Sequence, residues 1–292
     1  MKKKLRRTAL YVPGNDPSML QNAGIFGSDA IVLDLEDAVS VNEKDAARLL
    51  VRNALKNINY GDTEVIVRIN SLSTPFGKED LDVIGRVHPD GIRVPKVESI
   101  QDIQDIDKFL SRIEAEEGFE KNSIKIMPSI ESAIGVFNVF EIVKASHRIE
   151  VINFGAEDYT ADIGAERTKE GKELFDIRTK ILLAARVAGI EVQDSVFTYV
   201  RDIEGLIRET KFIKQLGFDG KSVIHPSQIQ PVHQVFTPSQ EEINQANRII
   251  LAIKEAEKKK SGVISLNGRM IDAPVVAKAR RTLKYAQAAN LL

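Results

Sequence analysis

The sequence has 292 residues, of which 43% are hydrophobic and 28% are charged. Its 41 basic residues nearly balance its 42 acidic ones, so the net charge of −1 gives no overall attraction to nucleic acid or to an anionic membrane. The absence of cysteine excludes disulfides, thiolate nucleophiles, iron–sulfur clusters and cysteine-ligated zinc.

The N-terminal residues Met1–Arg7 are basic, like the start of a signal peptide. The apolar run that follows, Thr8–Val12, is cut short by Pro13, whereas a signal peptide needs about 7–15 apolar residues. No other run approaches the roughly 20 apolar residues of a membrane span. We therefore expect a soluble, cytoplasmic protein that binds neither nucleic acid nor membrane.

Short runs rich in apolar and β-branched residues recur along the chain. Ala30–Leu35 and Glu64–Ile69 contain nearly continuous apolar runs, which are typical of parallel strands covered on both faces. The predicted strands are Ala9–Val12, Ala30–Leu35, Glu64–Ile69, Gly91–Val94, Ser123–Met127, Glu150–Phe154, Ile190–Gln193 and Ser222–Ile224.

Helical periodicity fills most of the intervals between these strands. In Ser99–Glu117 the isoleucines recur every three residues, which places them on one helical face. Ser239 and Glu242 have the spacing of a capping box, at the start of a helix expected to end near Gly262. The remaining predicted helices are Asn42–Leu55, Ser132–Ser146, Glu173–Ala188, Asp202–Leu216 and Val275–Ala289.

This alternation of strands and helices predicts an α/β protein, specifically a (β/α)8 TIM barrel with a C-terminal helical appendage. An open, doubly wound parallel sheet is the alternative that the same pattern permits. We expect residues 1–260 to form the catalytic barrel and residues 261–292 to form a separate C-terminal segment, because the sequence becomes rich in turn-forming residues after Gly262.

Charged residues gather where the predicted strands end, at the face on which barrel enzymes build their active sites. Several carboxylates beside one arginine and one lysine are costly to assemble unless a cation organises them. The four histidines are far apart in sequence, so oxygen ligands are expected. Mg²⁺ prefers oxygen ligands of this kind, and Mn²⁺ binds to the same kind of ligands. The best ligand pair is Glu131 with Asp158.

Each of the other charged residues has a structural and a functional interpretation. Asp34, Glu36 and Asp37 either cap helices and pair with lysines or act at the catalytic face. Arg68 either forms a structural ion pair or binds an anionic substrate, and its position at a strand end favours substrate binding. Lys96 is expected to stay protonated beside the carboxylates, which argues against a Schiff-base role.

The segment Gly217–Ser222 has only two residues between its glycines, whereas a phosphate loop needs four, so we exclude nucleotide hydrolysis.

Eight short motifs, in order along nearly the whole chain, resemble the citrate lyase β-subunit family, within the Mg²⁺-dependent acyl-CoA lyases (HpcH/HpaI aldolase-like). Single motifs of this length are weak evidence, but eight in register are strong. The motifs are Tyr11-Val-Pro-Gly-Asn, Leu33-Asp-Leu-Glu-Asp-Ala-Val39, Val67-Arg-Ile-Asn70, Arg93-Val-Pro-Lys96, Ile130-Glu-Ser132, Phe154-Gly-Ala-Glu-Asp-Tyr159, Gly217-Phe-Asp-Gly-Lys-Ser222 and Asn267-Gly-Arg-Met-Ile-Asp272.

The resemblance implies a barrel, usually a homotrimer, that splits a citryl thioester into oxaloacetate and an acetyl thioester by retro-Claisen chemistry during citrate fermentation. Carried over by position, Glu131 and Asp158 hold Mg²⁺ and Arg68 binds the oxaloacetate end. Asp272 is the acid–base carboxylate, delivered into a neighbouring subunit's site, and Tyr11 contacts the thioester arm. The group that removes the hydroxyl proton stays open, and its candidates are Glu36, Asp37 and metal-bound water. The expected substrate-binding residues are Arg68, Glu131, Tyr11 and Lys96.

The segment Asn15–Asn22 lacks the lysines that relatives acting on free CoA carry there. This favours a citryl group tethered to an acyl carrier protein, with the citrate lyase α (transferase) and γ (acyl carrier) subunits as partners, although CoA stays an alternative.

The competing hypotheses are a malyl-CoA or citramalyl-CoA lyase, a metal-dependent aldolase without a thioester, and a carrier-binding subunit without turnover.

Overall fold

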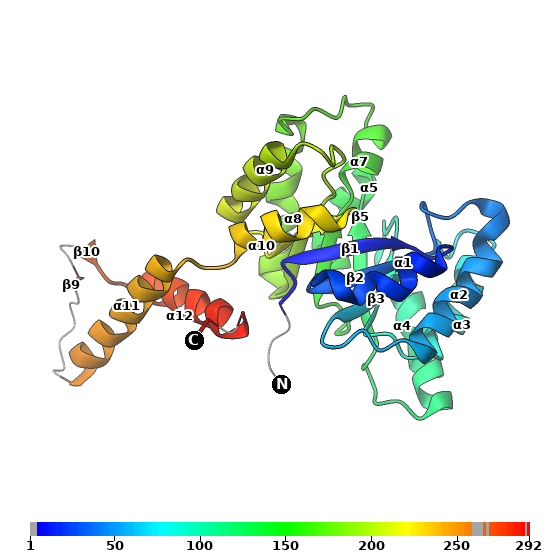
Figure 1. The fold of residues 1–292 in the computed structure, drawn as a ribbon, viewed down its shortest axis with the longest axis horizontal. Coiled ribbons are helices and arrows are strands. Elements are labelled where there is room, and N and C mark those ends of the chain that lie inside the picture. Colours follow the sequence, from blue (N-terminus) through cyan, green and yellow to red (C-terminus); the bar gives the residue numbers. More distant parts are fainter. Residues whose placement is uncertain (1–4, 259–264, 267–268, 290) are drawn as a thin grey trace. The chain divides into compact units, whose positions relative to one another are not determined.

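The computed structural model describes residues 5–258, 265–266, 269–289 and 291–292 (Figure 1). Eight parallel strands close into a barrel in the order β1 to β8, and β1 pairs with β8. This confirms the predicted TIM barrel and rules out the open sheet. The strands are β1 (Thr8–Pro13), β2 (Ala30–Asp34), β3 (Glu64–Arg68), β4 (Gly91–Val94), β5 (Lys125–Ile130), β6 (Val151–Phe154), β7 (Glu191–Asp194) and β8 (Gly220–Val223).

Helices follow the strands and cover them (Figure 1). Four of them, α1, α3, α7 and α10, lie in segments for which the sequence predicted no helix. The helices are α1 (Pro17–Asn22), α2 (Lys44–Asn57), α3 (Gly77–Gly85), α4 (Ile100–Glu117), α5 (Ala133–Phe137), α6 (Val139–Ile142), α7 (Ala156–Asp162), α8 (Phe175–Ala188), α9 (Ile203–Leu216), α10 (Ile229–Phe236), α11 (Gln240–Lys258) and α12 (Ala273–Ala288).

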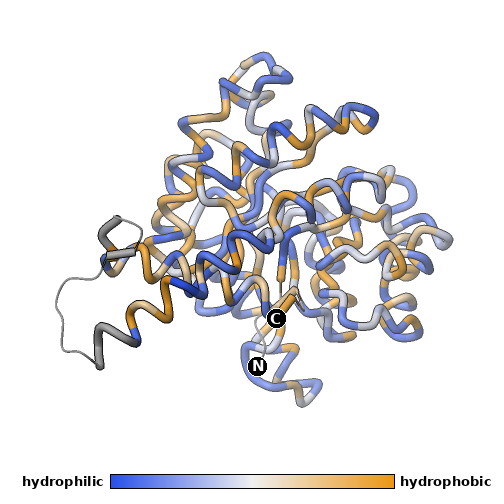
Figure 2. The backbone as a smooth tube through the Cα atoms, turned by 60° about the vertical axis from the view of Figure 1, so that its left-hand side comes forward, coloured by the Kyte–Doolittle hydropathy of each residue, from blue (hydrophilic) through white to orange (hydrophobic). Residues whose placement is uncertain are grey.

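The strands are covered on both faces, as their apolar runs predicted. All five residues of β2 are buried, and the strand segments at the middle of the barrel are coloured hydrophobic in Figure 2. One buried cluster contains small and medium-sized side chains of five strands, including Ala9, Ala30 and Ile66, and Tyr11 packs against it. Because side chains alternate along a strand, Tyr11 lies on the same face as Ala9, one step closer to the strand's carboxyl end.

Several predicted ranges differ from the structure at their ends, and two of these differences have a clear physical reason. Strand β5 begins two residues later than predicted and continues through Pro128, which pairs with Val94, because one missing N–H removes only one ladder hydrogen bond. The predicted helix Ser132–Ser146 is instead two short helices, α5 and α6. They are separated at Asn138, whose side chain donates to the carbonyl of Glu98.

The chain forms two compact units, Arg6–His233, which contains the whole barrel, and a second unit made mainly of Gln234–Leu292. Within the second unit, α11 and α12 pack through a cluster that includes Ile249, Ile271 and Ala279. The capping box between Ser239 and Glu242 is present at the start of α11. The predicted helix end near Gly262 and the predicted domain boundary at residue 260 lie outside the described residues. None of the described helices has the length and apolar character of a membrane span.

His233 of α10 should make the stability of the protein depend on pH. Its Nε2 lies 2.8 Å from Thr8 Oγ1. Burial, opposed by the Asp29 carboxylate, lowers the pKa of His233 to about 4. As the pH falls from 6.5 towards 4, the unfolded chain takes up a proton that the folded protein does not. The free energy of unfolding is therefore expected to fall by up to about 3 kcal/mol from this group.

We expect His233→Gln to flatten this dependence, measured as the urea midpoint at a series of pH values between 7 and 4. His147→Gln, at an exposed histidine, is the matched control and should leave the dependence unchanged. Equal slopes for the wild type and His233→Gln would contradict the assignment.

Candidate active site

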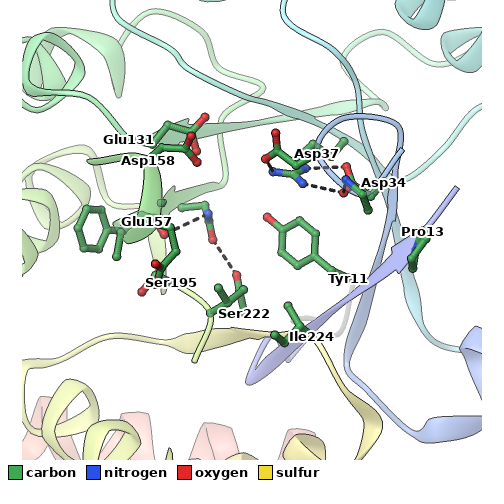
Figure 3. Close-up of a pocket in the computed structure, with 17 residues that line it drawn as sticks. Tyr11, Pro13, Asp34, Asp37, Glu131, Glu157, Asp158, Ser195, Ser222 and Ile224 are labelled. Atoms are coloured by element: carbon green, nitrogen blue, oxygen red, sulfur yellow. Dashed lines mark hydrogen bonds and ion pairs between the residues drawn. The ribbon is translucent and has the colours of Figure 1, made fainter. Parts of the chain in front are cut away.

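A pocket of about 400 Å³ opens at the carboxyl ends of the barrel strands (Figure 3). Every residue that lines it belongs to the Arg6–His233 unit. Six residues singled out from the sequence line this pocket, namely Tyr11, Asp34, Asp37, Arg68, Glu131 and Asp158. Two others, Glu36 and Lys96, lie beside it in ion pairs with lining residues.

Arg68 is held rigidly at the end of β3 by Asp34 at the end of β2. Its Nε and Nη2 donate to the two carboxylate oxygens of Asp34 at 2.7 and 2.6 Å, in a fork geometry. The same carboxylate accepts from the backbone amides of Glu36 and Ala38. Asp34 thus fixes both the loop after β2 and the guanidinium. The remaining nitrogen, Nη1, lies 2.8 Å from Glu36 Oε2 and 3.1 Å from Asp37 Oδ2.

Glu131 and Asp158 bring two carboxylates together on one wall of the pocket (Figure 3). Glu131 follows β5 directly, and its Oε1 accepts from the backbone amide of Lys96 at 2.6 Å. Burial, followed by the charge of Asp158, raises the pKa of Glu131 to about 7. In the described part of the chain, no ion pair neutralises Glu131, and Asp158 has only Lys96 Nζ, at 3.9 Å.

These two residues fit a hard divalent cation. A buried carboxylate without a cationic partner, next to a second carboxylate, is a costly arrangement that a bound cation would relieve. Among the described residues no group of three or more His, Cys, Asp or Glu could hold a metal. Mg²⁺ is commonly bound through one or two carboxylates plus water and substrate oxygens, which matches the Glu131–Asp158 pair. Mn²⁺ suits the same oxygens.

Gly155, at the end of β6, leaves room for the carboxylate of Glu131. A Cβ at this position would lie 2.7 Å from Glu131 Cβ and closer still to its Oε2. Gly155→Ala is therefore expected to displace Glu131 and to weaken Mg²⁺ and Mn²⁺ binding by about 10–100-fold. Calorimetric metal titration measures this effect.

Gly24→Ala is the matched control, since a Cβ there meets nothing closer than 3.3 Å and lies outside the pocket lining. Unchanged metal affinity in Gly155→Ala would show that Glu131 is not a ligand.

Glu36 and Lys96 form a charged pair beside the pocket. Lys96 Nζ lies 3.7 Å from Glu36 Oε1. Burial raises the pKa of Glu36 to about 8, although the charge of Arg68 opposes this. Burial alone would lower the pKa of Lys96, but Glu36 and Asp158 outweigh it and raise the pKa. The amine therefore stays charged, which agrees with the expectation that it forms no Schiff base.

Sequence reasoning missed several residues that line the pocket or contact a lining residue. Arg93, fully buried in β4, donates from Nη1 to the hydroxyl of Tyr11 at 2.9 Å. Ser222 of β8 donates to Asn153 of β6, and Ser195 follows β7. For Arg93 a signal was present, because a charged residue stands inside the four-residue buried strand Gly91–Val94. The serines and the asparagine carry no such signal.

The structure shows the contacts of two further residues from the sequence motifs, Lys221 and Asp272. Lys221, from the segment tested as a phosphate loop, is fully buried in β8 and pairs with Asp194 at 2.8 Å and Glu209 at 2.6 Å, so it has a structural role. Asp272 belongs to the second unit, where it caps α12 by accepting from the amide of Val275 at 3.1 Å. Its predicted acid–base role stays a prediction.

Comparison with known proteins gives a consistent assignment. The chain is 50% identical over 289 residues to the citrate lyase subunit beta of Leuconostoc mesenteroides subsp. cremoris, covering 99% of this chain and 96% of that protein. It is 36% identical to the mitochondrial citramalyl-CoA lyase of Homo sapiens, covering 96% of this chain and 85% of that protein.

A solved citrate lyase beta subunit from Mycobacterium tuberculosis, complexed with oxaloacetate and magnesium, has 28% identity and a TM-score of 0.68, covering 80% of this chain and 98% of that one. The family model described as HpcH/HpaI aldolase/citrate lyase matches residues 7–226, which includes the whole barrel. The chain belongs to the HpcH/HpaI aldolase/citrate lyase family.

Proposed function

We propose that this protein is a Mg²⁺-dependent carbon–carbon lyase that cleaves a citryl thioester into oxaloacetate and an acetyl thioester, as the β-subunit of a citrate lyase. The carrying observation is the pocket in which Arg68, fixed by Asp34, faces the Glu131–Asp158 pair. The 50% identity to a citrate lyase subunit beta and the oxaloacetate and magnesium in a related solved structure support this choice.

The substrate type explains the residue types. A citryl group carries a tertiary hydroxyl beside a carboxylate, and both become part of oxaloacetate. Arg68 presents Nη1 to this anionic end, with the planar, directed donors that a carboxylate needs. Mg²⁺ held by Glu131 and Asp158 would act as a Lewis acid on the hydroxyl and carboxylate oxygens. Lys96 Nζ adds a second positive charge to the same wall.

Cleavage requires that the hydroxyl lose its proton so that a ketone can form as the carbon–carbon bond breaks. Glu36 and Asp37 are the protein candidates for the base, and both approach Arg68 Nη1. Asp37 lines the pocket directly, whereas burial raises the pKa of Glu36 to about 8. Metal-bound water is the third candidate. The bonding electrons move to the thioester half, which leaves as an enolate.

The enolate must then be protonated at carbon, and we assign this step to Asp272 from a neighbouring subunit. Asp272→Asn is expected to slow the exchange of methyl protons of the acetyl thioester with solvent by about 10²–10⁴-fold, the usual contribution of a general acid. Deuterium incorporation followed by NMR measures it. Asn can still cap α12, so the fold should be retained. An unchanged exchange rate would transfer the role to another group.

We further propose that the thioester is carried by an acyl carrier protein, and that the chain works in the cytoplasm as a homotrimer with transferase (α) and acyl carrier (γ) subunits. The absence of lysine in the segment Asn15–Asn22, which contains α1, supports a carrier-bound substrate over free CoA. The residues 261–292, with Asp272, would serve the neighbouring subunit.

The testing experiment is an oxaloacetate-release assay with the purified protein, coupled to malate dehydrogenase. Citryl on acyl carrier protein and citryl on CoA are compared, each with Mg²⁺ and with EDTA. We expect metal-dependent release, faster from the carrier protein. No release from either substrate would overturn the proposal, whereas preference for CoA would overturn only the carrier assignment.

A citramalyl-CoA lyase is the second candidate, favoured by the 36% identity to the human enzyme of that name. The two functions differ in the ketone product, which is pyruvate from citramalyl and oxaloacetate from citryl. A lactate dehydrogenase-coupled assay on citramalyl-CoA therefore separates them. Pyruvate release faster than oxaloacetate release would favour this second function.

A further inference from the structure

Arg93 is a buried cation without a carboxylate partner. The side chain on β4 has no exposed surface, and its Nε has no hydrogen-bond partner. Its Nη1 donates to the Tyr11 hydroxyl at 2.9 Å and its Nη2 to Gln193 Oε1 at 2.7 Å, and both acceptors are neutral. In the described chain no ion pair includes Arg93. A buried charge left unpaired is costly, so a role beyond packing is indicated.

The contacts of Arg93 cross the barrel. β4 pairs with β3 and β5, yet Arg93 reaches Tyr11 on β1 and Gln193 on β7. Gln193 is fixed in turn, because its Nε2 donates to the carbonyl of Arg6 at 3.2 Å. The guanidinium on β4 is therefore held by residues of β1 and β7, and one of them, Tyr11, lines the pocket.

This arrangement leaves the Tyr11 proton available to a ligand. The phenol oxygen accepts from Arg93, and among the described residues nothing accepts from the Tyr11 hydroxyl. Two guanidinium groups lie close to the ring, with Arg68 at 4.9 Å and Arg93 at 5.5 Å from its centroid. Figure 3 shows the hydroxyl directed into the pocket, between the Glu131–Asp158 wall and Asp37.

We propose that the Tyr11 hydroxyl donates a hydrogen bond to the thioester carbonyl oxygen as it becomes an enolate oxygen, and that Arg93 positions and polarises that hydroxyl. This inference rests on the proposed function. In the cleavage, the electrons of the broken carbon–carbon bond move onto the thioester half, where the carbonyl oxygen gains negative charge. Tyr11 keeps its proton throughout, so the proton lost from the hydroxyl and the proton added to carbon are exchanged with other groups.

The assignment follows from how the other charges are used. Arg68 and the Glu131–Asp158 cation site serve the oxygens that remain in oxaloacetate, so the thioester oxygen needs a separate donor. Preorganised donors aimed at developing negative charge are usually a large part of catalysis. Tyr11 supplies such a donor, and the fixed positive charge of Arg93 behind it strengthens the hydrogen bond as charge develops.

Tyr11→Phe tests the donor role, with kinetics on the Mg²⁺-loaded enzyme and the preferred citryl thioester. We expect kcat to fall by about 10²–10³-fold, as for other single donors to an oxyanion, while KM and the affinity for oxaloacetate change little. Enzyme-catalysed deuterium exchange into the methyl group of the acetyl thioester, which requires the same enolate, should fall equally. Tyr60→Phe, which removes a hydroxyl that donates to the Leu20 carbonyl outside the pocket, is the control.

Arg93→Met and Arg93→Lys test the positioning role. Arg93→Met should reproduce the loss of Tyr11→Phe, and the double variant should be no slower than Tyr11→Phe alone, because both act through one hydroxyl. Arg93→Lys, which keeps a charge and a donor, should recover part of the rate and serves alone if Arg93→Met does not fold. Wild-type kcat and exchange in Tyr11→Phe, a change in KM only, or fully additive losses would overturn the inference. A wild-type protein that releases no oxaloacetate would overturn the proposed function as well.

Discussion

Glu131→Gln is expected to abolish metal-dependent cleavage, with a fall in kcat/KM of at least about 10³-fold, since the metal's electrostatic contribution to the transition state is several kcal/mol. The amide is nearly isosteric with the carboxylate and can still accept from the backbone amide of Lys96. The fold should therefore persist. What is lost is a negatively charged ligand on the wall shared with Asp158, so Mg²⁺ binding and turnover should fall together.

Asp158→Asn should have an effect of the same order, because neither carboxylate has another described carboxylate close enough to replace it in a cluster of three. Glu157→Gln is the matched control. Glu157 also lines the pocket, but it pairs with Arg167 Nε at 3.3 Å. We expect its activity within a few-fold of the wild type. Oxaloacetate release against Mg²⁺ concentration, and Mn²⁺ binding followed by electron paramagnetic resonance, measure these effects. A Glu131→Gln protein with a normal metal response would refute the ligand assignment.

Much of the barrel was predictable because parallel strands that are buried on both faces have nearly continuous apolar runs in their sequences. The range of β4 was predicted without error, and the other strands were found with shifted ends. Helix α3 was missed because its start at Phe76 has no side-chain cap and the helix is short. The extension of β5 through Pro128 was missed for a different reason, since the residue that usually ends a strand is tolerated here inside the closed sheet.

The same contrast holds in the pocket. Charged residues at strand ends are predictable, because the carboxyl ends of parallel strands meet at one face, and this brought Arg68, Glu131 and Asp158 together. The links between elements are not predictable from local pattern. The fork of Asp34 on Arg68 depends on the register of β2 against β3, which pairs these two residues directly. The contact of Arg93 with Tyr11 depends on which side chains meet across the barrel interior.

Arg68→Lys is expected to reduce kcat/KM by about 10²–10³-fold although it preserves the charge. Arg68 uses Nε and Nη2 to bind Asp34, and the remaining nitrogen, Nη1, which pairs with Glu36 and Asp37 in this structure, is the one that we assign to the substrate carboxylate. An ammonium is a single point charge without this fixed plane, so a lysine can satisfy Asp34 or a substrate carboxylate but not both in directed geometry. Since Asp34 is almost fully buried, the lysine should remain with Asp34 and leave the substrate without a donor.

Steady-state kinetics and the affinity for oxaloacetate, measured by calorimetry, distinguish this loss from unfolding. Arg112→Lys is the matched control, because Arg112 is exposed and pairs loosely with Glu116 at 3.7 Å. If Arg68→Lys kept the wild-type affinity and rate, the guanidinium would serve only as a partner for Asp34.

Asp34→Asn provides an independent check of the same ion pair. It keeps acceptors for the loop amides but weakens the fork, so it should raise KM and lower kcat while the metal affinity, set by Glu131 and Asp158, stays unchanged.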